Sequence, residues 1–346
     1  MKLGSHTIEK NSVPVFWPDI DVYFKNDFDL ALRLVDKITQ SGCGFLKGAL
    51  LHDKSLSVVS DRETKFYHAD LGWVSEPYHK ITERHVVPFN VLERVFKYAQ
   101  DAGLEIVLSV YDFEGVDFAE NLGACAIKIP SSNIVHRPLI EYAGKTKLPL
   151  VLDTGRSHFF EIERAVHWTR EIQVADLIVQ HSQPAPPEVP SSHHLNMMKH
   201  MGDTFSCVYG LSDHFPGDEA LVAAVALGAS VLEKGLIPEG IKPDIDVGHA
   251  LSVERLTEVV SKIEITHQMM GNDVRLIPDS AGRPQDRMGL IAKRDIQSGE
   301  SFSYENTTFA FPTLGVPVER FYDIKGNLSC RDIRKGSPIL QEYVTK

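Results

Sequence analysis

The chain has 346 residues, more than a single hydrophobic core usually supports, so two domains are expected. Its formal net charge is −11, and no stripe of lysine and arginine with interleaved aromatics occurs, so a nucleic-acid partner is not expected. No apolar run reaches the length of a membrane span, the first residues lack a signal-peptide pattern, and the four cysteines form no CxxC pair. These features predict a cytoplasmic protein with no membrane partner.

Short apolar runs alternate along the chain with amphipathic helical patterns. Such runs predict strands buried on both faces, and the alternation predicts parallel pairing through helical crossovers. Eight runs predict an α/β fold, a (β/α)8 TIM barrel. An open doubly wound sheet is the alternative, but no GxGxxG turn follows the first run. The runs are 13–17, 43–48, 105–110, 125–130, 148–155, 176–182, 205–214 and 230–236.

The chain changes character after a helical pattern that runs from His249 to Met270 and ends at Gly271. We therefore expect a barrel domain over 1–271. Residues 272–287, rich in Gly, Pro and charge, are expected to be a linker. Residues 288–346 contain a weak internal repeat of Arg-Asp-Ile segments and short β segments with Gly turns. They predict a small β-rich domain, too small to be stable without docking on something else.

Barrel enzymes carry their catalytic residues at the carboxyl ends of the strands. Two lysines, Lys47 and Lys128, lie there among apolar residues, and such lysines are costly to bury unpaired. A phosphate would satisfy both, with help from the Ser131 and Ser132 hydroxyls. The alternative is that each lysine pairs with a carboxylate at a strand end, such as Glu233. The other polar candidates at strand ends are Asp19, Ser109, Tyr111, Asp153, Thr154, His181, Ser212, Asp213, His214 and Lys234.

Five segments in chain order resemble the sialic acid synthase family, which includes N-acetylneuraminate, pseudaminate and legionaminate synthases and their spore-coat relatives. The match to LSDH and the following Ala-rich helix, together with AKRDI and the glycine that follows it, is the most specific part. The last segment is similar to the start of the family's antifreeze-like (SAF) domain. The segments are CAIKIPSSN (125–133), LVLDTGRSHFFEIERAV (150–166), QPAPPEV (183–189), LSDHFPGDEALVAAVALGASVLEKG (211–235) and LIAKRDIQSGESFSYENTTF (290–309).

This resemblance implies a synthase that condenses phosphoenolpyruvate with an aldose to give a 2-keto-3-deoxy sugar acid. It implies a divalent metal, Mn²⁺ or Mg²⁺, with His214 as a ligand, and Asp19 near the acceptor carbonyl. It also implies a domain-swapped homodimer in which each SAF domain caps the partner's barrel. The residues implied to bind substrate are Lys47, Lys128, Ser131, Ser132, Ser212 and Asp213, with Gln183 and Phe311 standing where the family has acceptor-side residues.

Several family positions are altered here. The second metal histidine falls on Gly235, and the serine before Thr154 is Asp153, which would repel a phosphate unless it is paired. The acceptor glutamine is Ala49, and the arginine that reads the acceptor's acyl group falls on Phe311. Because the lysines are kept while the acceptor side is changed, we expect a non-standard acceptor.

Gly235 offers no metal ligand, so we expect either a weakened site formed by His181 and His214 or no metal. Glu233 is expected to face the other side of its strand from residue 235. Two further interpretations remain open. One is a lyase or aldolase in which Lys128 forms a Schiff base. The other is a non-catalytic protein that binds a sugar acid or a partner and has lost its metal chemistry.

Overall fold

The computed structural model describes residues 1–9, 12–68, 71–183, 189–238, 247–275 and 286–345. The chain divides into two compact units, Met1–Gly271 and Asn272–Lys346. Most of the proposed linker (276–285) and part of the QPAPPEV segment (184–188) lie outside the described residues. Among those described, no helix has the length and apolar character needed to span a bilayer.

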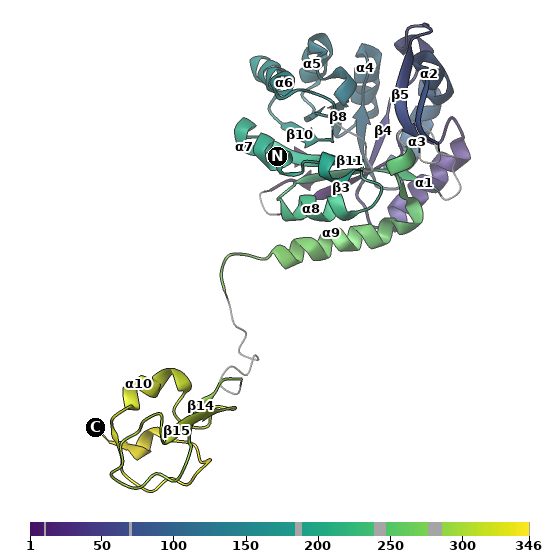
Figure 1. The fold of residues 1–346 in the computed structure, drawn as a ribbon. Coiled ribbons are helices and arrows are strands. Elements are labelled where there is room, and N and C mark those ends of the chain that lie inside the picture. The colour runs from purple at the N-terminus through teal and green to yellow at the C-terminus, as the bar shows by residue number, and fades with distance from the viewer. Residues whose placement is uncertain (10–11, 69–70, 184–188, 239–246, 276–285, 346) are drawn as a thin grey trace. The chain divides into compact units, whose positions relative to one another are not determined.

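The first unit is a closed barrel of parallel strands (Figure 1). Each strand pairs with the next along the chain, and the last one, β12, pairs with both β11 and β3, which closes the sheet. This confirms the predicted (β/α)8 barrel. The strands are β3 (Val15–Asp19), β4 (Phe45–Ala49), β7 (Glu105–Ser109), β8 (Ala126–Ile129), β9 (Leu150–Asp153), β10 (Leu177–His181), β11 (Val208–Asp213) and β12 (Val231–Ile237).

Helices surround the barrel because each has one apolar face. In α1, Leu30, Leu34 and Ile38 recur at helical spacing and are buried, and the Asp27 carboxylate caps the amino end by accepting from the Leu30 N–H at 3.0 Å. The helices that follow the strands are α1 (Phe28–Gln40), α3 (Phe89–Asp101), α4 (Phe113–Leu122), α5 (Arg137–Ala143), α6 (Phe159–Glu171), α7 (Asn196–Phe205), α8 (Glu219–Ala226) and α9 (Leu256–Met270).

The two ends of the barrel differ in chemistry. A hairpin of β1 (Lys2–Leu3) and β2 (His6–Thr7) covers the amino end, where Leu3 packs with Trp17, Phe45 and other apolar side chains. The long connection after β4 forms a second hairpin, β5 (Glu63–His68) and β6 (Gly72–Pro77), followed by α2 (Tyr78–His85). The carboxyl end of the barrel holds buried charged side chains, among them Lys47, Lys128 and Glu233.

The helical pattern beginning at His249 does not give a helix along its whole length. Residues 247–249 form a single 3-10 turn, and β13 (Leu251–Ser252) extends the sheet by pairing with Leu236 and Ile237 of β12. Helix α9 begins only at Leu256. The apolar spacing was therefore a correct signal for α9, but the pattern begins with the end of this turn and the short strand, and a 3-10 helix over Val253–Arg255 leads into α9.

The second unit has its own small core. The antiparallel pairs are β14 (Gly289–Ala292) with β15 (Thr307–Ala310) and β16 (Leu328–Ser329) with β17 (Val344–Thr345), and α10 spans Phe321–Ile324. The two Arg-Asp-Ile segments of the internal repeat pair with each other, because Ile296 and Ile333 exchange both backbone hydrogen bonds at 2.8 Å. Their side chains are buried with Leu290 and Phe302.

Candidate active site

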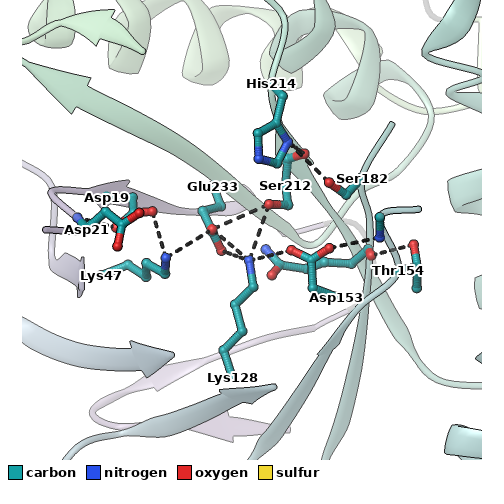
Figure 2. A network of polar contacts seen from close by, with 12 residues as sticks. Asp19, Asp21, Lys47, Lys128, Asp153, Thr154, Ser182, Ser212, His214 and Glu233 are labelled. Carbon is teal, nitrogen blue, oxygen red and sulfur yellow. Dashed lines mark hydrogen bonds and ion pairs between the residues drawn. The ribbon is translucent and has the colours of Figure 1, made fainter. Parts of the chain in front are cut away.

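Strand alternation and register bring charged side chains from around the barrel to its carboxyl end. Side chains alternate along a strand, and partners in register face the same side. Asp19 is in register with Lys47, and Ser109 with Lys128. Asp153 is in register with Gln180, and Ser212 with Glu233. Figure 2 shows the resulting cluster inside the barrel mouth.

Ion pairs connect the two lysines and three carboxylates of this cluster. Lys128 Nζ lies 2.7 Å from Asp153 Oδ2 and 2.7 Å from Glu233 Oε1. Lys47 Nζ lies 2.7 Å from Asp19 Oδ2 and 3.7 Å from Glu233 Oε1. Glu233 therefore joins the two lysines, and all five side chains are buried. We call these five residues the ion-pair chain.

The pKa shifts within the ion-pair chain follow from burial and neighbouring charge. Burial raises the pKa of Asp19 to about 7, although the Lys47 charge opposes the shift. Burial would lower the pKa of Lys128, but the charges of Asp153 and Glu233 outweigh it, so the pKa is raised. Lys128 is therefore an ammonium at neutral pH. A lysine that forms a Schiff base needs a lowered pKa, so that its amine is uncharged and nucleophilic.

The serines predicted to bind phosphate differ in position. Ser212 Oγ lies 3.2 Å from Lys128 Nζ, inside the cluster. A Cβ built on Gly155 would lie 3.2 Å from Ser131 Oγ and 3.1 Å from Ser182 Oγ. Both hydroxyls therefore lie close to the backbone of Gly155, two residues after Asp153. Ser132 is exposed, and its hydroxyl donates to Asn133 Oδ1 at 3.3 Å. Ser131 and Ser212 are thus better placed than Ser132.

Asp213 does not point into the barrel mouth. It is in register with Lys234, and its Oδ2 lies 2.8 Å from Lys234 Nζ with both side chains fully buried. Its Oδ1 accepts from the Phe215 N–H at 2.8 Å. Because Ser212 and Glu233 face inward, Asp213 and Lys234 face the surrounding helices. The structure gives Asp213 a packing role there and offers no support for substrate contact.

The predicted pair of metal-binding histidines is not brought together. Ser182 Oγ lies 3.1 Å from His214 Nδ1, so His214 lies on the side of β10 that Ser182 faces. His181, the preceding residue, points to the opposite side, and its Nε2 lies 2.6 Å from the His193 carbonyl oxygen. His181 is therefore held by a hydrogen bond to a loop carbonyl oxygen.

The expectation for Glu233 was also wrong. Residues two apart on a strand face the same side, so Glu233 and Gly235 both face inward. Glu233 is therefore available to Lys128, at 2.7 and 2.8 Å. The alternative in which the buried lysines pair with carboxylates at strand ends is what the structure contains.

The sequence reasoning missed two buried polar side chains, His249 and Gln180. The His249 ring lies edge-on to the His214 ring, with centroids 4.4 Å apart. Gln180 is fully buried in register with Asp153, and neither its amide nitrogen nor its oxygen has a hydrogen-bond partner among the described residues. Gln180 could have been found from alternation, because it shares a face with Ser182. His249 carried no signal, since it stood at the start of a helical pattern.

The remaining acceptor-side candidates are placed as follows. Gln183 is partly buried, with no hydrogen-bond partner to its amide oxygen among the described residues. Phe311 belongs to the second unit, where 62% of it is exposed. A group of three possible metal donors, His52, Asp112 and Glu114, also occurs. Asp112 already caps α4 by accepting from the Gly115 N–H at 2.8 Å, so a structural role accounts for it.

Comparison with known proteins agrees with this architecture. The NeuB family model matches residues 34–275, and the SAF domain model matches residues 287–344. These observations define a class of protein. Its members have a barrel with charged side chains at the carboxyl end, followed by a small C-terminal SAF domain. The chain belongs to the NeuB family.

Its relatives share little sequence but most of their length. An N,N'-diacetyllegionaminic acid synthase from Campylobacter jejuni is 25% identical over 91% of this chain and 95% of its own. A pseudaminic acid synthase from Helicobacter pylori is 24% identical over 96% and 98%. An uncharacterized protein from Methanocaldococcus jannaschii is 28% identical over 92% and 91%.

Solved structures share the fold. A spore coat polysaccharide biosynthesis protein E from Chromobacterium violaceum is similar with a TM-score of 0.70 at 20% identity, covering 96% of this chain and all of that one. An N-acetylneuraminic acid synthetase from Leptospira borgpetersenii also has a TM-score of 0.70, at 19% identity, covering 82% of this chain and 94% of its own.

Proposed function

We propose that this protein condenses phosphoenolpyruvate with an aldose to form a 2-keto-3-deoxy sugar acid, and that the aldose is not one of the usual N-acylated acceptors. The observation that carries the proposal is the pair of lysines, Lys47 and Lys128, at the carboxyl end of a NeuB-family barrel. The relatives named as legionaminic and pseudaminic acid synthases support this reaction class. The altered acceptor positions, Ala49 and Phe311, support a different aldose.

In this reaction the electron pair of the phosphoenolpyruvate double bond forms the new bond to the aldehyde carbon, and the aldehyde oxygen takes up a proton. Water then adds at the cationic carbon and phosphate leaves. Lys47 and Lys128 would hold the anionic groups, assisted by the Ser131 and Ser212 hydroxyls. Asp19, with a pKa of about 7, can hold or release a proton near neutral pH beside Lys47.

His214 would be a ligand of a divalent ion, which when bound would supply Lewis-acid chemistry to the aldehyde carbonyl. Imidazole nitrogen is a suitable ligand for such an ion, and His214 supplies one at the barrel mouth.

The direct test is phosphate release from phosphoenolpyruvate with Mn²⁺ and a panel of aldoses, in parallel with calorimetric titration of phosphoenolpyruvate into the protein. We expect release that depends on one aldose. We also expect Lys128→Gln to abolish it, whereas Lys199→Gln, a change at an exposed lysine on α7, does not. Failure of the folded wild-type protein to bind phosphoenolpyruvate would contradict the proposal.

One observation favours a second function, that of a non-catalytic protein binding a sugar acid or another protein. Each lysine of the ion-pair chain is already paired, and Asp153 adds a carboxylate beside Lys128. A protein of this kind would bind a sugar acid without releasing phosphate. A Schiff-base lyase lacks comparable support because the pKa of Lys128 is raised, and borohydride would then trap no carbonyl substrate.

For assembly, we propose a homodimer in which each SAF domain covers the partner's barrel. The support is the family resemblance and the small core of the second unit, which contains few large apolar side chains. Light scattering should give twice the mass of the chain, and a truncated protein ending at Met270 should lose activity. A fully active monomeric barrel would contradict this.

A further inference from the structure

A second imidazole lies beside His214 at the mouth of the barrel. His249 belongs to the turn of residues 247–249, between β12 and β13, and only 6% of it is exposed. The ring centroids of His214 and His249 are 4.4 Å apart, and the rings are inclined by 66°. Metal–nitrogen bonds of 2.0–2.1 Å put each ring centre about 3 Å from an ion, so two ligand rings have centres about 4–6 Å apart. The observed spacing is compatible with a shared ion.

Gly235 packs against Tyr23 and against Ala250, the residue that follows His249. Gly235 faces inward, as Glu233 does, and a Cβ built on it would lie 3.1 Å from the Tyr23 hydroxyl and 3.5 Å from the Ala250 Cβ. The segment next to His249 therefore packs directly over the glycine. A larger side chain at 235 would need the space that Tyr23 and this segment now fill.

The hydrogen bonds of His214 leave one ring nitrogen suited to a metal. Its Nδ1 lies 3.1 Å from the Ser212 carbonyl oxygen, which can only accept a hydrogen bond. Ser182 Oγ, which can accept or donate, lies 3.1 Å from the same nitrogen. The tautomer with the hydrogen on Nδ1 can donate to the Ser212 carbonyl and leaves the ring lone pair on Nε2. Histidine ligands of metals are commonly held in this way, with the other ring N–H donated to a carbonyl oxygen.

We propose that His214 and His249 together provide two nitrogen ligands for one divalent metal ion, with His249 supplying the donor that residue 235 lacks. The remaining coordination positions fall to water or to oxygen atoms of the substrate, as in open catalytic sites. The catalytic role of this metal ion rests on the proposed function. The proposal predicts metal binding, however, that can be measured without turnover.

The test is titration of the metal-free, full-length protein with Co²⁺ and Mn²⁺, followed by calorimetry and by the visible absorption of Co²⁺. We expect one ion per chain in the wild type. Loss of a residue that only orients a ligand costs about 10–100-fold in affinity, so His249→Gln and His214→Gln should each weaken binding by at least about 100-fold. His181→Gln, at a buried histidine that faces the helices, should change the affinity less than about threefold.

A measurement on the wild type keeps the proposal testable if a variant does not fold. Pulsed electron paramagnetic resonance of the Mn²⁺ complex should detect two imidazole nitrogens bound to the ion. One nitrogen or none, no stoichiometric binding, or a folded His249→Gln protein that binds as tightly as the wild type would each overturn the proposal. Metal binding without aldose-dependent phosphate release would support this site and count against the proposed reaction, so the two failures are distinguishable.

Discussion

Asp153 is the residue by which the ion-pair chain can be tested most directly. Two lysines face three carboxylates there, and Asp153 Oδ2 lies 2.7 Å from Lys128 Nζ, on the group that would hold a phosphate. Changing Asp153 to Asn removes one negative charge and keeps the shape. Asn also keeps the oxygen that accepts from the Gly155 N–H at 3.1 Å. Lys128 retains Glu233 at 2.7 Å, so its charge stays compensated and the protein should fold.

The size of the effect follows from the repulsion that is removed. Two unit charges about 4 Å apart interact with about 4 kcal/mol at an effective dielectric of about 20, and a phosphate on Lys128 would be near this distance from the Asp153 carboxylate. Screening by dissolved ions and neighbouring charges reduces this value. We therefore expect a gain of at least about 1.4 kcal/mol, which is about tenfold in affinity for inorganic phosphate and for phosphoenolpyruvate.

Calorimetric titration of both anions at constant ionic strength measures this gain. Asp203→Asn is the matched control, because it removes the same charge from an exposed position on α7. The control should leave anion affinity within about twofold of the wild type. If folded Asp153→Asn binds phosphate no better than the wild type, then Asp153 does not compete for Lys128, and the phosphate site lies elsewhere.

Three further predictions concern stability. Lys128→Ala should weaken phosphoenolpyruvate binding. Because it leaves the buried Asp153 carboxylate uncompensated and Glu233 with only Lys47, at 3.7 Å, it should also cost about 3–5 kcal/mol of unfolding free energy in urea titrations; an unchanged midpoint would contradict the ion-pair chain. Asp213→Ala should cost a similar amount without changing anion affinity, because it strands the buried Lys234 ammonium; a selective loss of anion binding would restore Asp213 to the site. The pKa of Asp19 is about 7 when folded and 3.8 by its ordinary value, so its protonated form favours the fold. The stability of the wild type relative to Asp19→Asn should therefore fall as the pH rises from about 4 to 7, and a rise over that range would refute the assignment.

The barrel and its charged end could be predicted from the sequence because both depend on local order. Apolar runs such as 125–130 and 148–155 fix which segments become buried strands, and alternation fixes which of their side chains share a face. Lys47 and Lys128 could be placed at strand ends for the same reason. Alternation also places Glu233 and residue 235 on the same face of their strand, so the inward direction of Glu233 was contained in the sequence.

Other contacts were decided only by the closure of the barrel. Lys128 and Glu233 are 105 residues apart and meet because β8 and β12 face each other across the interior, a distance that no local pattern encodes. His181 and His214 were both expected at the site, yet their strand positions turned one ring outward and the other inward.

The approach of His249 to His214 depends on the path of the chain after β12, where β13 adds to the sheet and Ala250 packs against Gly235. The sequence by itself determined the fold, the family and the kinds of group that meet at the mouth of the barrel. The tertiary structure decided which of those groups are paired, because pairing depends on register and on side-chain direction across strands that are distant in sequence.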